Sequence, residues 1–233
     1  MGLGMGTGLF FDWTMILLIP GIIFAAIAKS KVTSTFAKYS KVYSERGIQS
    51  QEIVAKMLRN ENLMDVEINA VDGNLTDNYN PKDRSLNLSQ SVYGSTSIAS
   101  IGVAAHEAGH AIQHGTGYKA LMMRSFMYPV VKIGSTLSWP LFLAGIIFSF
   151  KPLLQIGITA FAIAVIFTLV TLPVEFNASR RAVQILEDDG YLSTDEIRGV
   201  RAVLSAAALT YVASAVSALL QLLRLVLIAR RRR

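Results

Sequence analysis

The sequence predicts a mostly α-helical integral membrane protein, a bundle of three to four transmembrane helices that carries a small α+β domain. Two observations predict this class. Hydrophobic residues make up 52% of the 233-residue chain and charged residues only 16%, whereas a soluble domain carries about 25% charged residues. The apolar residues also gather in runs of about 20, the length that a helix needs to cross the hydrocarbon core of a bilayer.

Three of these runs carry few or no charges, and they cover residues 9–28, 129–150 and 153–174. Only Lys151 and Pro152 separate the second run from the third, so these two are expected to form a hairpin. A fourth run at 206–229 is interrupted by several serines, Gln221 and Arg224. Two alternatives stay open for it: it spans the bilayer, or it lies along the surface as an amphipathic helix.

The basic residues predict how the helices are oriented. Four lysines follow the first span and no basic residue precedes it: Lys29, Lys31, Lys38 and Lys41. By the positive-inside rule the region after the first span lies in the cytoplasm, and the hairpin returns Glu175 to the same side. The arginines at 230–233 would break the rule if the fourth run spanned. They suit lipid headgroups better than nucleic acid, and no base-reading module is present, so we expect no nucleic-acid partner.

The chain therefore divides into four segments: a first transmembrane helix at 1–28, a cytoplasmic α+β region at 29–128, a transmembrane hairpin at 129–174, and a C-terminal part at 175–233. Within the α+β region, residues 50–60 have the period of an amphipathic helix, and four apolar residues share one face of it: Ile53, Val54, Met57 and Leu58. Residues 66–70 alternate like a strand, and residues 85–89 like an edge strand.

The last helix of this region contains all three histidines of the chain. Ser95 or Ser97 can cap its start, and Gly115 can end it after His114. Alanines at positions 104, 105, 108 and 111 indicate a closely packed, buried helix. Because ionisable groups are costly to bury without partners, polar side chains on such a helix indicate a ligand.

Residues 106–110 read His-Glu-Ala-Gly-His, the H-E-x-x-H pattern of zinc peptidases. Four residues of helix turn about 400°, so His106 and His110 project from one face, one turn apart. Both rings can then reach one zinc ion at about 2.0–2.1 Å. Glu107 is rotated by about 100° from His106 and can hydrogen-bond a metal-bound water. The absence of cysteine excludes thiolate ligands.

A catalytic zinc site needs a third protein ligand and one open position. His114 lies about 12 Å along a straight helix from His106, so it could share the metal only if the helix broke at Gly109. The other alternative is Glu175, an acid directly after the uncharged third span, where Pro173 can bend the helix. Glu175 is the ligand that we expect.

The sequence also resembles a known family. The HEAGH string at 106–110, the hairpin and the EFNASRRA string at 175–182 resemble the YugP-like neutral membrane zinc metallopeptidases, as does LTDNYNP at 75–81. This resemblance implies a gluzincin-like site holding one Zn²⁺ per chain. His106, His110 and Glu175 would be its ligands, and Glu107 its base. Ser179 stands where the wider group usually has an acid.

The resemblance implies a zinc-dependent endopeptidase of the cell membrane that cleaves protein or peptide substrates, themselves expected to be membrane-associated. Four residues are candidates for stabilising the transition state: Tyr79, His114, Asn177 and Arg180. Leu86 and Leu88 would contact a peptide added to the strand at 85–89. Two alternatives stay open, a catalytically silent zinc-binding scaffold and a metal transporter, although the third span offers few polar groups for transport.

Overall fold

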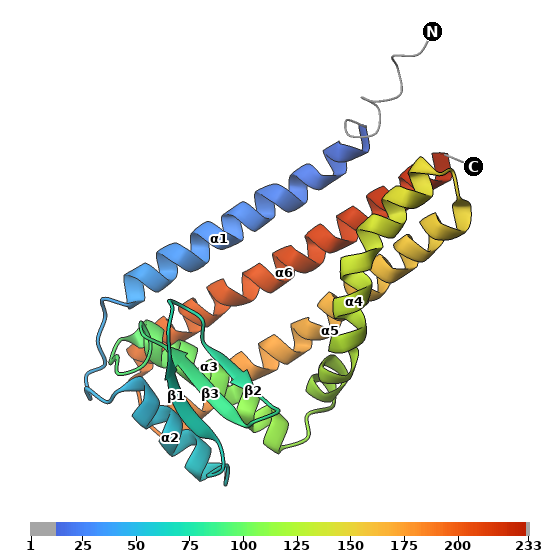
Figure 1. Ribbon diagram of the computed structural model, residues 1–233. Coiled ribbons are helices and arrows are strands. Elements are labelled where there is room, and N and C mark those ends of the chain that lie inside the picture. The colour runs from blue at the N-terminus through green and yellow to red at the C-terminus, as the bar shows by residue number, and fades with distance from the viewer. Residues whose placement is uncertain (1–12, 232–233) are drawn as a thin grey trace. The chain divides into compact units, whose positions relative to one another are not determined.

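The computed structural model describes residues 13–231, and the chain divides into two compact units that we describe separately (Figure 1). Of the described residues, the first unit comprises 13–27, 124–170 and 211–231. The second comprises residues 28–123 and 171–210. Each unit is thus assembled from segments that are distant in the sequence.

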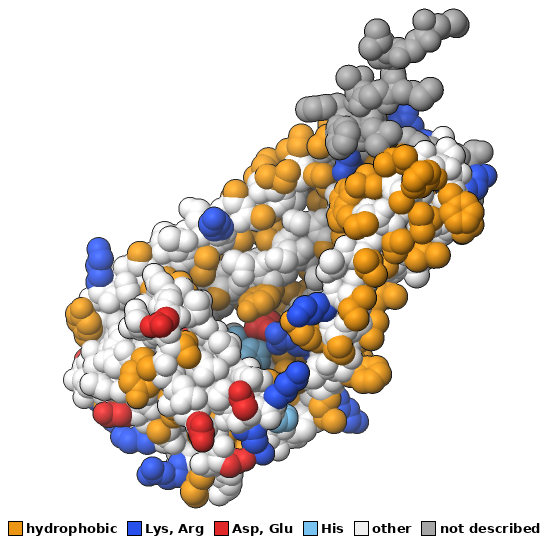
Figure 2. All heavy atoms as spheres, in the orientation of Figure 1, with side chains coloured by type: hydrophobic (Ala, Val, Ile, Leu, Met, Phe, Trp, Pro, Cys, Tyr) orange, Lys and Arg blue, Asp and Glu red, His pale blue; other side chains and the backbone are white. Residues whose placement is uncertain are grey.

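Four long apolar helices account for most of the chain. They are α1 (Ile19–Tyr39), which follows a 3₁₀ turn at Trp13–Leu18, α4 (Lys119–Ile147), α5 (Lys151–Asp188) and α6 (Thr194–Arg231). All four are long and apolar enough to cross a membrane, which confirms the predicted mostly α-helical membrane class. Large apolar side chains stay exposed on the first unit, for example Phe126 at 80% and Phe148 at 75%, and Figure 2 shows such side chains over α1 and the α4–α5 hairpin.

The helices extend beyond the apolar runs from which they were predicted. Helix α5 continues through Pro173 to Asp188, so Glu175 lies on the same helix as the third span. Helix α6 begins at Thr194 and includes the whole fourth run, with a length and composition that suit a span. Residues 9–12 of the first predicted span lie outside the described residues.

The predicted hairpin is present in the first unit, and glycines let its two helices approach closely. A β-carbon at Gly145 would lie 2.5 Å from the backbone nitrogen of Leu154, and one at Gly157 would lie 2.7 Å from that of Phe142. Small residues at such crossings allow the backbone contact that stabilises helix pairs in lipid.

A three-stranded sheet lies in the second unit, with strands β1 (Glu67–Val71), β2 (Asn78–Asn80) and β3 (Ser85–Ser89). Their order is β1-β3-β2, with β1 parallel and β2 antiparallel to β3. The prediction of an edge strand at 85–89 is therefore wrong, because β3 is the central strand.

Side chains flanking the strands explain why a central strand can look polar. Ser89 donates from its backbone nitrogen and its hydroxyl to the carboxylate of Asp77, at 2.8 and 2.9 Å. The hydroxyl of Ser85 donates to Asp83 at 2.7 Å. Buried polar groups are tolerated when they are paired in this way, so the serines of β3 do not require an exposed edge.

Helix α3 (Ile98–Gly115) lies against the sheet, with contacts to β2, β3 and α2 (Ser50–Asn60). Of the two predicted caps, Ser95 and Ser97, it is Ser97 that caps the start of α3, by accepting a hydrogen bond from the nitrogen of Ser100. The predicted apolar face of α2 is confirmed as buried. The core around α3 also takes in the later part of α5 and the start of α6; among its members are Ile53, Met57, Leu86, Leu88, Ile101, Ala104, Ala108, Ile112, Ala182, Leu186 and Val200.

Candidate metal centre

The candidate site lies in the second unit, where α3 crosses the part of α5 that follows Pro173. The two backbones come very close at Gly109. A β-carbon built on Gly109 would lie 2.5 Å from the carbonyl oxygen of Ala178 and 3.2 Å from its α-carbon. Ala178 is itself completely buried. The absence of a side chain at Gly109 therefore lets α5 lie close to the face of α3 that carries the two histidines.

Three side chains converge at this crossing. The Nε2 atoms of His106 and His110 lie 3.2 and 3.5 Å from Oε2 of Glu175. The two imidazole rings meet edge to face with their centroids 4.8 Å apart. The three side chains are almost fully buried, with exposed fractions of 12%, 10% and 3%.

These separations suit a zinc ion. Donor atoms on neighbouring corners of a tetrahedral site, with bonds of about 2.0–2.1 Å, lie about 3.3–3.4 Å apart. One potential ligand atom from each of His106, His110 and Glu175 lies within 4.8 Å of the others. Two imidazoles and one carboxylate are also the donor set of a known class of catalytic zinc sites. The residues present therefore fit the metal.

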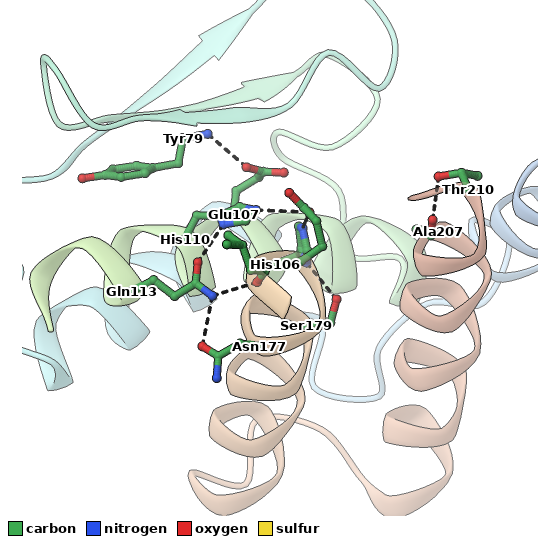
Figure 3. Close-up of polar contacts among 11 residues, drawn as sticks. Tyr79, His106, Glu107, His110, Gln113, Asn177, Ser179, Ala207 and Thr210 are labelled. Atoms are coloured by element: carbon green, nitrogen blue, oxygen red, sulfur yellow. Dashed lines mark hydrogen bonds and ion pairs between the residues drawn. The ribbon is translucent and has the colours of Figure 1, made fainter. Parts of the chain in front are cut away.

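The other nitrogen of each imidazole has a partner of its own (Figure 3). Nδ1 of His106 lies 3.0 Å from the hydroxyl of Ser179, one turn along α5 from Glu175. Nδ1 of His110 lies 3.0 Å from Oε1 of Gln113. Outer partners of this kind orient metal-binding histidines.

The sequence reasoning missed Gln113, although it stands three residues after His110 on the same helix. The sequence also assigned no role to Ser179, because this serine stands where the wider group that the chain resembles usually has an acidic residue. The missing signal is spatial in both cases: one turn of helix brings each side chain beside a histidine, and only the fold shows which atoms meet.

Glu107 points toward β2. Its Oε2 accepts a hydrogen bond of 3.0 Å from the backbone nitrogen of Tyr79. Tyr79 is paired with Leu86 in the sheet, and because its N–H donates to Glu107 on α3, this nitrogen points toward α3. The edge strand thus holds one oxygen of the carboxylate beside the two histidines.

His114 does not join the cluster. Its Nδ1 lies 2.8 Å from the hydroxyl of Tyr79, and α3 continues without a break through Gly109. Burial raises the pKa of the Tyr79 phenol above its ordinary value, so this hydroxyl stays protonated and can donate. Arg180 is exposed on α5.

Leu86 and Leu88 were expected to contact substrate, and this expectation is wrong. Both are completely buried in the core of the second unit. Because β3 has a neighbour on each side, neither its edge nor these two side chains can be reached by a peptide.

The charges around His110 act in opposite directions. Burial disfavours the protonated imidazole, but the carboxylates of Glu175 and Glu107 outweigh it and raise the pKa of His110 above its ordinary value. Two carboxylates therefore lie near His110, and the same negative charges would attract a divalent cation.

Comparison with known proteins agrees with this geometry. Residues 14–230 match the family model described as "Putative neutral zinc metallopeptidase". The chain belongs to this family. It is 47% identical over 201 residues to a protein of Bacillus subtilis (strain 168) named "Putative membrane protease YugP", a match that covers 86% of this chain and 89% of that protein. No solved structure gives a significant match.

Membership confirms the family resemblance seen in the sequence motifs. It also agrees with the four apolar helices and with a group of ligands that suits zinc. The protein is thus a membrane member of this family, and its candidate metal site lies in the second unit.

We predict that Gly109→Ala separates the two helices that carry the site. The added methyl group would meet a backbone oxygen that cannot move away independently, and overpacking of this kind costs about 1–3 kcal/mol. The gain from the better helix propensity of alanine is at most about 1 kcal/mol. The variant should have a lower melting temperature and bind less zinc than the wild type.

Gly134→Ala is the matched control, because the nearest atoms to a β-carbon there lie 4.0 Å away. It should leave the zinc content unchanged and should not lower the melting temperature, since no clash offsets the better helix propensity of alanine. Equal behaviour of the two variants would contradict the role assigned to the close approach at Gly109.

Proposed function

We propose that the protein is a zinc-dependent membrane endopeptidase whose metal is held by His106, His110 and Glu175. The observation that carries this proposal is the convergence of the two Nε2 atoms on Glu175 Oε2, at 3.2 and 3.5 Å. The family and its membrane protease relative support the same reaction class.

Zinc at this position would lower the pKa of a bound water toward about 7 and polarise the scissile carbonyl group. Glu107 is the general base in this proposal. Its Oε2 is held by the backbone nitrogen of Tyr79 at 3.0 Å, which leaves Oε1 to take the proton from water and deliver it to the leaving amine. The same contact limits rotation of the carboxylate, so the base stays beside the metal ligands.

Several polar groups near the base could stabilise the oxyanion of the transition state. The Tyr79 hydroxyl and His114 form a hydrogen-bonded pair, and the backbone nitrogen of the same tyrosine donates to Glu107, so this pair is our choice. Asn177 is already engaged by Gln113 and Arg181, and Arg180 is exposed, so both fit this task less well.

Metal content tests the proposed ligands. We expect about one equivalent of zinc in the purified wild-type protein and far less in His110→Ala and Glu175→Ala. Each variant keeps only two of the three protein ligands that a catalytic zinc site needs. His114→Ala is the control and should keep its zinc. Full zinc content in Glu175→Ala would show that the third ligand lies elsewhere.

Glu107→Gln separates the enzyme from a catalytically silent zinc scaffold. The amide is similar in size but cannot accept the proton from water, so hydrolysis of a peptide substrate should fall by at least about 100-fold, the contribution of general base catalysis. Zinc content should stay at the wild-type level. Unchanged hydrolysis would exclude Glu107 as the base.

We also propose that the second unit faces the cytoplasm and cleaves protein or peptide substrates at the membrane. The lysines that follow the first span support this orientation. Because the chain contains no cysteine, single cysteines can report the side of the membrane without background.

The test uses an impermeant maleimide on intact and on lysed cells. Asn74 lies on an exposed turn of the second unit, and Phe148 lies at the turn of the α4–α5 hairpin, 75% exposed. Phe148→Cys should react in intact cells and Asn74→Cys only after lysis. The reverse pattern would place the site on the outer side.

A further inference from the structure

Gln113 is a neutral polar side chain that is completely buried at the crossing of α3 and α5. Burying an amide is costly unless it is hydrogen-bonded. Both the NH₂ group and the oxygen of the Gln113 amide are hydrogen-bonded. Its Nε2 donates to the carbonyl oxygen of Val174 at 2.8 Å and to Oδ1 of Asn177 at 3.0 Å, and its Oε1 faces Nδ1 of His110 at 3.0 Å.

The two partners of Nε2 determine which way the amide points. The carbonyl of Val174 can only accept a hydrogen bond, so the atom that faces it must be the NH₂ group. Asn177 leads independently to the same orientation. Its Oδ1 accepts from Nε of Arg181 at 2.9 Å, and an arginine can only donate, so Asn177 presents oxygen to Gln113 as well.

The orientation of the amide in turn determines the tautomer of His110. Because the NH₂ group of Gln113 faces α5, its oxygen faces the imidazole, and an oxygen can only accept. Nδ1 of His110 must therefore carry a hydrogen. A neutral imidazole has a single N–H, so the lone pair is on Nε2, the atom that lies 3.5 Å from Oε2 of Glu175.

His106 is held differently, and the difference is chemical. Its Nδ1 faces the hydroxyl of Ser179, which can either donate or accept. Ser179 alone is therefore compatible with both tautomers of His106. Gln113, with Val174 and Asn177 behind it, is compatible with only one neutral tautomer of His110.

We propose that Gln113 is a positioning residue for the metal centre: it holds His110 in the Nδ1–H tautomer and aims the lone pair of Nε2 at the ion, while Asn177 and Arg181 hold the amide in place. This inference rests on the proposed zinc site. It assigns Gln113, Asn177 and Arg181 a task in metal binding rather than contact with substrate.

The test compares two substitutions of Gln113 in the full-length protein by measuring zinc affinity in competition with a chelator. Gln113→Leu removes the acceptor for His110 and should weaken zinc binding about 10–100-fold, the usual effect of losing an outer partner. Gln113→Glu, protonated at this buried position, keeps an oxygen facing Nδ1 of His110 and an O–H that can donate to the carbonyl of Val174 in place of the NH₂ group. It should bind zinc within about threefold of the wild type.

A role in packing alone predicts the opposite order. A leucine is suited to a completely buried position, whereas a buried carboxyl group is costly, so Gln113→Glu would then be the more damaged variant. Gln184→Leu is the matched control, since Gln184 is exposed on α5 in the same unit, and its zinc affinity should equal that of the wild type.

The melting temperature of each metal-free variant and the absorption spectrum of its cobalt(II) form accompany the measurement. If Gln113→Leu does not fold, Gln113→Met replaces it as the variant without an acceptor. Two outcomes would overturn the assignment of Gln113 alone. One is wild-type zinc affinity in Gln113→Leu or Gln113→Met, and the other is weaker zinc binding in Gln113→Glu than in Gln113→Leu. Absence of zinc from the wild-type protein would overturn the proposed site with it.

Discussion

The close contact between Gly109 and Ala178 is the constraint on which the site depends. The two histidines come from α3, whereas Glu175 and Ser179 come from α5, so the site exists only where these helices nearly touch. A β-carbon at Gly109 would lie 2.5 Å from a backbone oxygen, and a larger residue would force the helices apart. The small residues Gly109 and Ala178 thus allow the histidines of α3 to lie beside Glu175 of α5.

Burial at this crossing makes the hydrogen bonds around the candidate ligands specific. A polar atom without a partner is expensive in such surroundings, and the partners differ in which protons they can give or take. Gln113 offers His110 only an acceptor, whereas Ser179 offers His106 either role. The backbone N–H of Tyr79 donates a hydrogen bond to the carboxylate of Glu107. The orientation of each group near the proposed metal therefore follows from the chemistry of its neighbour.

The expectation of an edge strand at 85–89 failed because strand pairing and flanking carboxylates, and not the local alternation, decided the outcome. The alternation of serine and leucine at 85–89 indicated an edge strand, but Asp77 and Asp83 satisfy those serines and β1 and β2 flank the strand. Leu86 and Leu88 are core residues for the same reason. Local pattern succeeded where one element alone decided the outcome, as in the buried face of α2 and the Ser97 cap of α3.

The sequence by itself determined the membrane class, three apolar spans and the pairing of His106 with His110, because helical period and span length depend only on residues near in the chain. It left open whether the fourth run at 206–229 spans the bilayer. It also singled out Glu175 by its position after an uncharged span. Only the tertiary structure decided that α5 runs unbroken through Pro173 and brings Glu175 to the histidines, 65 residues or more away in the chain. Gln113, Asn177 and Arg181 likewise acquire their partners only when α3 and α5 pack, since hydrogen bonds between helices leave no periodic trace in the sequence.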